Sequence, residues 1–327
     1  MGEAICSKKR EIASNLVERV ANKSGEEIPN KYLHKHGFPE AIDEPSVWYH
    51  SLLIDFAMLA SSTPAAVDEL AKLRSALSSW GCFQVINHGI DGSFLEEMIE
   101  NVKQFSALPV EEKLKCSGPD EKLVGYGTGK FSAGAQPADW NDALYLVLHP
   151  PEKRTLQFYP HKPEKYSGMI QEYTEKLAVI AEATYKAMAR SLDLKDDCFL
   201  SHQVKNTLIK GRFIYYPSCP RPEHVLGVKP HSDGTYMTVL LPDNEVDGLQ
   251  VLKDEHWYKV PVIPGALFIN LGDLGEVMTN GIYKSTVHRV VTNSEKHKVS
   301  VAAFWIPEDG YEIGPISELV SREKQQK

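Results

Sequence analysis

The sequence predicts an α+β protein in which a helical N-terminal part packs on an all-β C-terminal core. Before about residue 205, apolar residues recur three or four positions apart, as on the buried face of a helix. After about residue 207, short β-rich runs alternate with Pro, Gly, Asn and Asp, a spacing typical of a β-sandwich or barrel. We therefore expect a helical region with leading strands over residues 1–205, a β-core over 206–310 and a C-terminal tail over 311–327.

Three amphipathic helices are expected in the N-terminal part, near residues 64–80, 93–105 and 169–188. Thr63 is a suitable cap for the first, and Pro64 suits its first turn. Ser93 and Glu96 stand in the capping-box relation at the start of the second. The apolar stripe of each helix is expected to face the core. Residues 1–50 are polar and are expected to form an arm or helix laid over that core.

The strands are predicted from runs of β-branched and aromatic residues. Turn signals such as Pro264-Gly265 and Asn280-Gly281 separate the later runs, which favours antiparallel hairpins over βαβ crossovers. The expected strands lie at residues 83–86, 213–216, 236–241, 248–252, 266–270, 287–291 and 299–305.

Composition and charge exclude several classes. The chain has 36 Lys and Arg against 44 Asp and Glu, a net charge of −8, which argues against a nucleic-acid partner. Its 5 cysteines are scattered without a C-x-x-C pair, so we expect a reducing compartment and no thiolate zinc site. No apolar run is long enough to span a bilayer, and the N-terminus lacks a signal-peptide pattern. We expect a cytoplasmic protein, a monomer or weak oligomer, without membrane contact.

Two motifs invite a functional interpretation that their details do not support. The glycine-rich run from Gly125 to Lys130 is followed by Phe131, whereas a phosphate-binding loop requires Ser or Thr there, so we expect a loop. His88 follows a predicted strand and precedes a turn, where a structural role is the simpler expectation.

The candidate chemistry lies in His231-Ser232-Asp233. Residues two apart in a strand project from the same face, so both side chains could reach one metal ion. His288 lies 55 positions beyond Asp233 in another predicted strand, and closure of the fold can bring it beside the pair. Two imidazoles and one carboxylate that leave open positions are the ligand set of non-haem Fe(II) oxygenases. Zinc would more often take three His or add Cys.

With these motifs, the sequence resembles the plant 2-oxoglutarate- and Fe(II)-dependent dioxygenases, the group that contains flavonol and anthocyanidin synthases and many alkaloid and hormone oxidases. The resemblance implies a double-stranded β-helix, or jelly roll, with N-terminal helices packed around it. It rests on blocks in the same order along the chain, at residues 51–56, 80–89, 215–220, 231–233, 257–258, 264–273, 286–290 and 300–304.

The resemblance implies that His231, Asp233 and His288 bind Fe(II). It also implies that 2-oxoglutarate chelates the iron and that Tyr216 and Ser300 help to hold its far carboxylate.

Two cosubstrate positions depart from the family pattern. Lys298 stands where the family has Arg, and Ile214 where it has Asn. Lys298 keeps a positive charge on the strand face of Ser300 but offers a point charge instead of a planar fork, so weaker binding is expected. Arg289 is not expected to substitute, because strand alternation turns it away from the ligand His288.

For the substrate, the resemblance implies contacts from Phe304, Arg212 and Phe131. The implied reaction consumes O2 and 2-oxoglutarate, releases succinate and CO2, and oxidises a small plant specialised metabolite or hormone, above all by hydroxylation, with ascorbate as a reductant. Two alternatives stay open because of Lys298 and Ile214. One is an ascorbate-dependent non-haem iron oxidase, and the other is an inactive small-molecule binding protein on the same fold.

Overall fold

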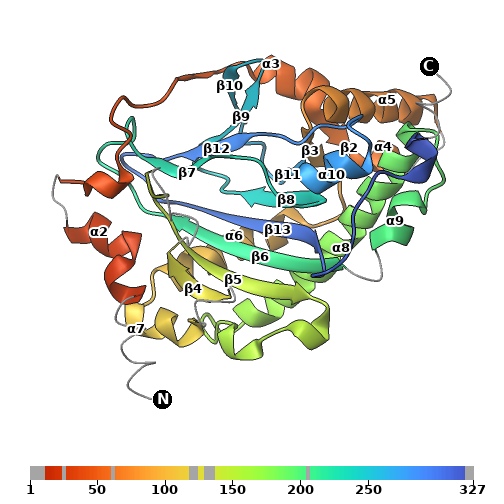
Figure 1. Ribbon diagram of the computed structural model, residues 1–327. Helices are drawn as coiled ribbons and strands as arrows, with labels where there is room; N and C mark the ends of the chain where they lie inside the picture. The colour runs from red at the N-terminus through yellow and green to blue at the C-terminus, as the bar shows by residue number, and fades with distance from the viewer. Residues whose placement is uncertain are drawn as a thin grey trace.

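Two facing β-sheets form the centre of the protein, and helices cover the outer face of the larger sheet (Figure 1). The computed structural model describes residues 12–23, 27–59, 63–117, 124–128, 137–203 and 207–320. Neighbouring strands run antiparallel except for β1 with β10 and β2 with β3, which are parallel. This arrangement is the predicted jelly roll.

The strand order defines each sheet. The smaller sheet consists of β1 (Ala41–Ile42), β10 (His256–Lys259), β9 (Leu249–Lys253), β12 (His288–Val291) and β7 (Leu226–His231). The larger sheet consists of β2 (Leu53–Asp55), β3 (Cys82–Ile86), β11 (Leu267–Leu271), β8 (Met237–Pro242), β13 (Lys298–Pro307), β6 (Thr207–Tyr216), β5 (Asp142–His149) and β4 (Gly125–Thr128).

The helices are mostly N-terminal to the jelly roll in sequence. The three that were expected are α5 (Pro64–Ser79), α6 (Gly92–Ser106) and α8 (Tyr166–Ser191). Shorter helices are α2 (Val17–Lys23), α3 (Pro45–Val47), α4 (Phe56–Leu59), α7 (Val110–Lys113), α9 (Cys198–Gln203) and α10 (Asp273–Met278). Single helical turns are η1 (Asn30–Tyr32), η2 (Trp48–Leu52), η3 (Leu114–Cys116), η6 (Pro151–Lys153) and η7 (Leu156–Phe158).

Alternation along β13 separates the helix-facing side of the larger sheet from its interior side. Val299, Val301 and Ala303 are fully buried in the core that the sheet forms with the helices. Lys298 and Ser300, one position out of phase, instead line the space between the two sheets. On β6, Phe213 packs edge-on against Tyr166 of α8, with ring centroids 5.8 Å apart. The apolar stripes of α6 and α8 are buried as predicted.

Two predictions about local backbone structure in the N-terminal part are wrong. The capping box at Ser93 and Glu96 does not form, because α6 begins one residue earlier, at Gly92, where the carbonyl of Asp91 accepts the first intrahelical hydrogen bonds. The glycine-rich run is also not simply a loop. Gly125–Thr128 forms β4, which pairs antiparallel with β5, so the backbone of this segment is satisfied by the sheet.

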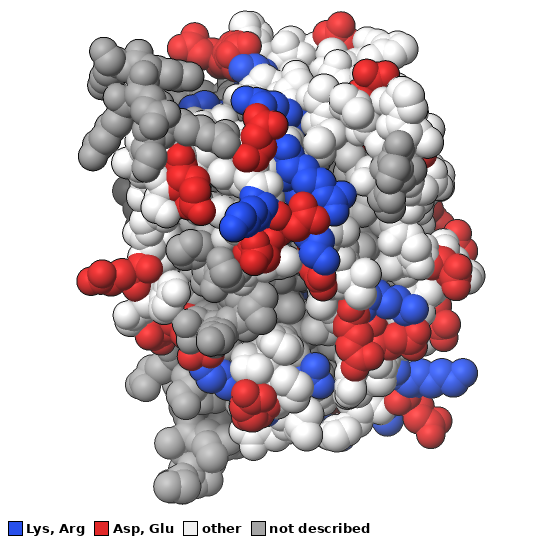
Figure 2. Space-filling view, turned by 90° about the vertical axis from the view of Figure 1, so that its right-hand side faces the viewer, with Lys and Arg blue, Asp and Glu red and all other residues white. Residues whose placement is uncertain are grey.

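The described part of residues 1–50 lies over the core, as expected. Val17 of α2 and Tyr32 of η1 are buried, and Tyr32 packs edge-on against Trp140 with ring centroids 4.9 Å apart. On the molecular face in Figure 2, the coloured Lys and Arg side chains are interspersed with Asp and Glu. Among the described residues, no helix is both long and apolar enough to cross a membrane.

Candidate iron site and adjoining cavities

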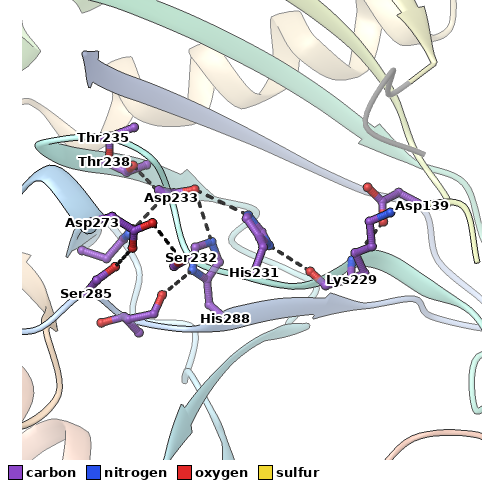
Figure 3. A network of polar contacts seen from close by, with 12 residues as sticks. Asp139, Lys229, His231, Ser232, Asp233, Thr235, Thr238, Asp273, Ser285 and His288 are labelled. Carbon is purple, nitrogen blue, oxygen red and sulfur yellow. Dashed lines mark hydrogen bonds and ion pairs between the residues drawn. The ribbon is translucent and has the colours of Figure 1, made fainter. Parts of the chain in front are cut away.

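The three predicted ligands meet between the sheets. His231 ends β7, His288 begins β12, and the two residues lie directly opposite each other in the antiparallel register. Their Nε2 atoms lie 3.5 Å and 3.9 Å from Oδ1 of Asp233. Possible ligand atoms of the three residues all lie within 4.8 Å of one another (Figure 3). The structure therefore brings the sequence-predicted triad into one cluster.

Asp233 reaches this cluster differently from the prediction. The expected shared strand face requires β7 to continue, but β7 ends at His231 and Asp233 lies beyond it. The backbone there is held by α10, because the amide of Asp273 donates to the carbonyl of Asp233 at 2.8 Å. The Ser232 hydroxyl donates to Oδ2 of Asp273 at 3.2 Å, which further fixes the loop.

Both imidazoles are oriented by backbone carbonyls. Nδ1 of His231 lies 2.9 Å from the Lys229 carbonyl, and Nδ1 of His288 lies 3.1 Å from the Thr286 carbonyl. Since a carbonyl only accepts, each Nδ1 carries the proton, which leaves the Nε2 lone pair for a metal. Burial lowers the pKa of His288, against the nearby charge of Asp233, and this favours the neutral imidazole that binds metals.

The carboxylate of Asp233 is fixed by two side-chain donors. The Thr238 hydroxyl and the Asn270 amide both donate to Oδ2, at 2.7 Å and 3.0 Å. Oδ1 is thereby left facing the two imidazoles. Burial alone would raise the pKa of Asp233, but the two histidines outweigh it and hold this pKa well below its usual range. Two imidazole nitrogens and one carboxylate oxygen form a donor set that fits Fe(II).

An inner cavity extends from this cluster between the sheets, and the cosubstrate residues line it. Lys298, Ser300, Tyr216 and Ile214 all face this cavity, together with apolar residues such as Leu240 and Leu249. The side chain of Lys298 is buried, and its Nζ lies 5.4 Å from the Tyr216 ring centroid. Burial lowers the pKa of Lys298 to about 8, partly opposed by Asp247 and Asp243. A cation is thus held inside an otherwise largely apolar space.

An outer cavity adjoins the inner one at the cluster, and His231 and Asp233 line both. Phe304 and Arg212, two of the predicted substrate residues, face it together with Tyr145 of β5. Phe131, the third, lies outside the described residues. The rings of Tyr145 and Phe304 are nearly parallel, with an interplanar angle of 1° and centroids 6.4 Å apart.

The two residues excluded from the site are structural. Arg289 is turned away from the cluster, as expected. Its guanidinium lies 4.1 Å from the Trp257 ring centroid and 4.9 Å from that of Phe38, and its Nε donates to Gln250. Nε2 of His88 lies 2.8 Å from the Gly265 carbonyl, within a turn.

Sequence reasoning missed several residues of the site. Thr238 and Asn270, which hold Asp233, belong to segments that were read only as strands. The signal was a polar residue within an apolar run, as with Asn270 between Ile269 and Leu271. Asn141, which accepts a hydrogen bond from Arg212, and Tyr145 carried no recognisable signal.

Comparison with known proteins agrees with this geometry. Residues 205–307 match the model of the 2OG-Fe(II) oxygenase superfamily, and residues 53–169 match that of the non-haem dioxygenase in morphine synthesis N-terminal domain. The chain is 34% identical to Protein SRG1 of Arabidopsis thaliana, over 96% of this chain and 88% of that protein. The chain belongs to the 2OG-Fe(II) oxygenase superfamily.

Other relatives of this oxygenase have more specific names. It is 35% identical to codeine O-demethylase of Papaver somniferum, over 94% of this chain and 86% of the relative. A crystal structure of JOX2 in complex with 2-oxoglutarate, iron and jasmonate superposes with a TM-score of 0.84 at 34% identity, covering 93% of this chain and 86% of that one. The oxygenase uses Fe(II) and 2-oxoglutarate, and His231, Asp233 and His288 form its candidate iron site.

Proposed function

We propose that this oxygenase oxidises a small plant specialised metabolite or hormone, above all by hydroxylation, and releases succinate and CO2. One observation carries the proposal: His231 and Asp233 line both the inner and the outer cavity. A cosubstrate in the inner cavity and a substrate in the outer cavity would therefore both reach the same metal ion.

The inner cavity suits a short dicarboxylate. His288 lies opposite Val251 of β9 in the sheet register. Gly248 precedes Val251 by three residues, and a Cβ added to Gly248 would lie 2.9 Å from Nζ of Lys298. Three strand residues span about 10 Å. The candidate iron site and the ammonium thus bracket a channel in which the keto acid end faces the metal and the far carboxylate meets Lys298.

The residues that line the inner cavity have three separate roles in this proposal. His231, Asp233 and His288 hold Fe(II), which when bound supplies the oxygen activation that couples cosubstrate decarboxylation to substrate oxidation. Lys298 binds the far carboxylate of 2-oxoglutarate with the hydroxyls of Ser300 and Tyr216. The apolar walls keep water out, and a charge interaction is stronger in such surroundings.

The outer cavity holds the substrate, with Phe304 and Arg212 as contact residues. The relatives named above include a codeine O-demethylase and a protein crystallised with jasmonate, so similar proteins bind chemically different molecules and at least one catalyses an outcome other than hydroxylation. Which hydrogen faces the metal decides among them. Hydroxylation needs no further step, and we therefore propose it here.

Anaerobic titration tests the proposal without a substrate. Fe(II) is added to the apoprotein, 2-oxoglutarate is titrated, and the visible charge-transfer absorption of the chelate is followed. We expect a saturable band that His231→Ala abolishes and that Lys298→Ala shifts to at least about 10-fold higher 2-oxoglutarate concentration. Lys186→Ala is the matched control, because this exposed lysine pairs with Glu182 on α8 and lines neither cavity. Bound iron without a band would favour an ascorbate-dependent oxidase or a carrier instead.

A further inference from the structure

The outer cavity has a buried cation, Arg212, for which the proposed function names no partner group. Arg212 is 7% exposed, and its Nη2 donates to Oδ1 of Asn141 at 2.8 Å. The Asn141 amide is itself fixed, since its Nδ2 donates to the Gly227 carbonyl at 2.6 Å. Nε of Arg212 is buried and has no hydrogen-bond partner in the described parts of the chain. A buried N–H without a hydrogen-bond partner lowers the stability of the protein. A ligand that accepts a hydrogen bond from this N–H would remove that cost.

The charges around Arg212 do not compensate it. Lys210, two residues earlier on β6, faces the same cavity, as does Lys229 of β7. Within the described ranges, neither Arg212 nor Lys210 forms an ion pair with a carboxylate. Apart from Asp233, the carboxylate lining this cavity is that of Asp139, whose Oδ1 accepts the backbone N–H of Lys229 at 3.0 Å. Positive charge is therefore in excess on this wall.

The metal and the cosubstrate do not remove this excess. In the proposed complex, the charges of Fe(II), Asp233, doubly ionised 2-oxoglutarate and protonated Lys298 cancel. Among the described residues, the charge on Arg212 is then left without a counterion next to the reacting centre. A buried charge without a partner is unfavourable, so an anionic group on the next molecule to enter would gain a charge-assisted hydrogen bond there.

The other residues that line the outer cavity indicate the kind of molecule to which the anionic group belongs. The ring of Tyr145 lies under the guanidinium, 5.9 Å from Cζ of Arg212, and is nearly parallel to the ring of Phe304. Ile306 and Val228 add apolar surface to the same cavity. Flat aromatic walls favour a flat or ring-shaped apolar body.

We propose that the outer cavity selects substrates that carry a carboxylate on an apolar, ring-containing body, and that Arg212 binds the carboxylate. This inference rests on the proposed function, because it takes the outer cavity as the substrate site. Asn141 positions the guanidinium, and Lys210 strengthens the positive potential without being the principal contact.

Matched acids and amides test this directly. The protein is loaded anaerobically with Fe(II) and 2-oxoglutarate, and binding is measured by calorimetry for 1-naphthaleneacetate, trans-cinnamate and 3-cyclohexylpropanoate, each against its primary amide. We expect at least one acid to bind about 10-fold or more tightly than its amide. In Arg212→Gln this ratio should fall to near one, whereas Arg190→Gln, which alters an exposed arginine paired with Asp196, should leave it unchanged.

The outcomes separate this inference from the proposed function. If the wild-type chelate band never forms, the proposed function fails. If the band forms but no acid binds more tightly than its amide, including the case in which none binds, the carboxylate inference is overturned and the proposed function stands. Since the acid and amide are compared on the wild-type protein, the test holds even if Arg212→Gln does not fold. An unchanged ratio in a folded Arg212→Gln protein would overturn the role of Arg212.

Discussion

The Asn270 amide donates to Oδ2 of Asp233 at 3.0 Å, from β11 of the larger sheet, and so decides which carboxylate oxygen faces the two histidines. Thr238 donates to the same oxygen from β8. Both donors sit on adjacent strands of the larger sheet, whereas the histidines come from the smaller sheet. The candidate iron site is therefore assembled by the closure of the two sheets, and its carboxylate is oriented by the sheet opposite its imidazoles.

Thr238→Val and Asn270→Ala should each weaken divalent metal binding by about 10- to 100-fold, because Asp233 would be free to rotate or to bind in a different mode. Anaerobic titration with Fe(II) or Co(II) measures the effect without turnover. Thr184→Val is the matched control, since this buried threonine donates only to a backbone carbonyl in α8. Wild-type affinity in both site variants would show that Asp233 is held by its backbone alone.

The affinity for 2-oxoglutarate should fall as the pH rises through about 8, the lowered pKa of Lys298. Below that pH the ammonium is present in the free protein. Above it the free protein is neutral at this position, and binding of the dicarboxylate must take up a proton, so the dissociation constant rises by up to about 10-fold per pH unit. The charges of Asp247 and Asp243, which act on Lys298, oppose the lowering of its pKa but do not outweigh burial.

Lys298→Arg isolates this titration, because a guanidinium stays charged at every pH of the experiment. The dissociation constant of the variant, measured from the chelate band, should not change between pH 7 and 9. A parallel loss of affinity in wild type and variant would assign the pH dependence to the metal ligands instead.

The sequence predicted those parts of the protein whose signals are local. The stripes of α6 and α8 repeat within one element, and His231 and Asp233 stand two positions apart. His288 was added from another predicted strand, and the family resemblance implied the complete ligand set. In contrast, β5 was not predicted, although it supplies Tyr145 and pairs with β6 over its length. Its place in the sheet depends on a partner about 70 residues away, and no turn signal joins the two strands.

Side-chain partnerships were the least predictable features. The link between Arg212 and Asn141, and the support of Asp233 by Asn270, join residues from separate strands. They become visible only once the register is known. The position of Asp233 beyond the end of β7 likewise depends on a hydrogen bond to Asp273, which alternation in the sequence does not encode.

Gly81→Ala should destabilise the protein strongly, and Gly89→Ala should do so only mildly. Both glycines have positive φ, +71° and +83°, so backbone strain of about 1–3 kcal/mol applies to each. A Cβ on Gly81 would also lie 2.2 Å from the Lys284 carbonyl, whereas nothing lies within 4 Å of one on Gly89. The melting temperatures of the two variants separate the cost of backbone strain alone, in Gly89→Ala, from strain combined with the clash at Lys284, in Gly81→Ala. An equal fall in melting temperature in both variants would contradict the tight contact between the α5–β3 turn and Lys284.

Asp142 links the N-terminal arm to the sheet, because its two carboxylate oxygens accept the backbone N–H groups of Val17 and Glu18, each at 2.9 Å. Asp142→Ala would leave these two donors unsatisfied and should lower the free energy of unfolding by about 1–3 kcal/mol. Asp91→Ala is the control, since Asp91 stands at the start of α6 without a side-chain cap bond.

The contribution of Asp142 to the free energy of unfolding depends on pH, because its pKa differs between the folded and the unfolded chain. Burial raises the pKa of Asp142 to about 7, although the hydrogen bonds from Glu18 and Val17 oppose the shift. Between about pH 4 and 7 the unfolded chain has lost the proton that the folded protein keeps, so this contribution to stability decreases as the pH rises and is constant above about 7. The free energy of unfolding, measured with denaturant, should therefore differ between pH 5 and pH 7 in wild type. This difference should be smaller in Asp142→Asn, whose side chain cannot ionise. An equal difference in both proteins would place the responsible proton on another residue.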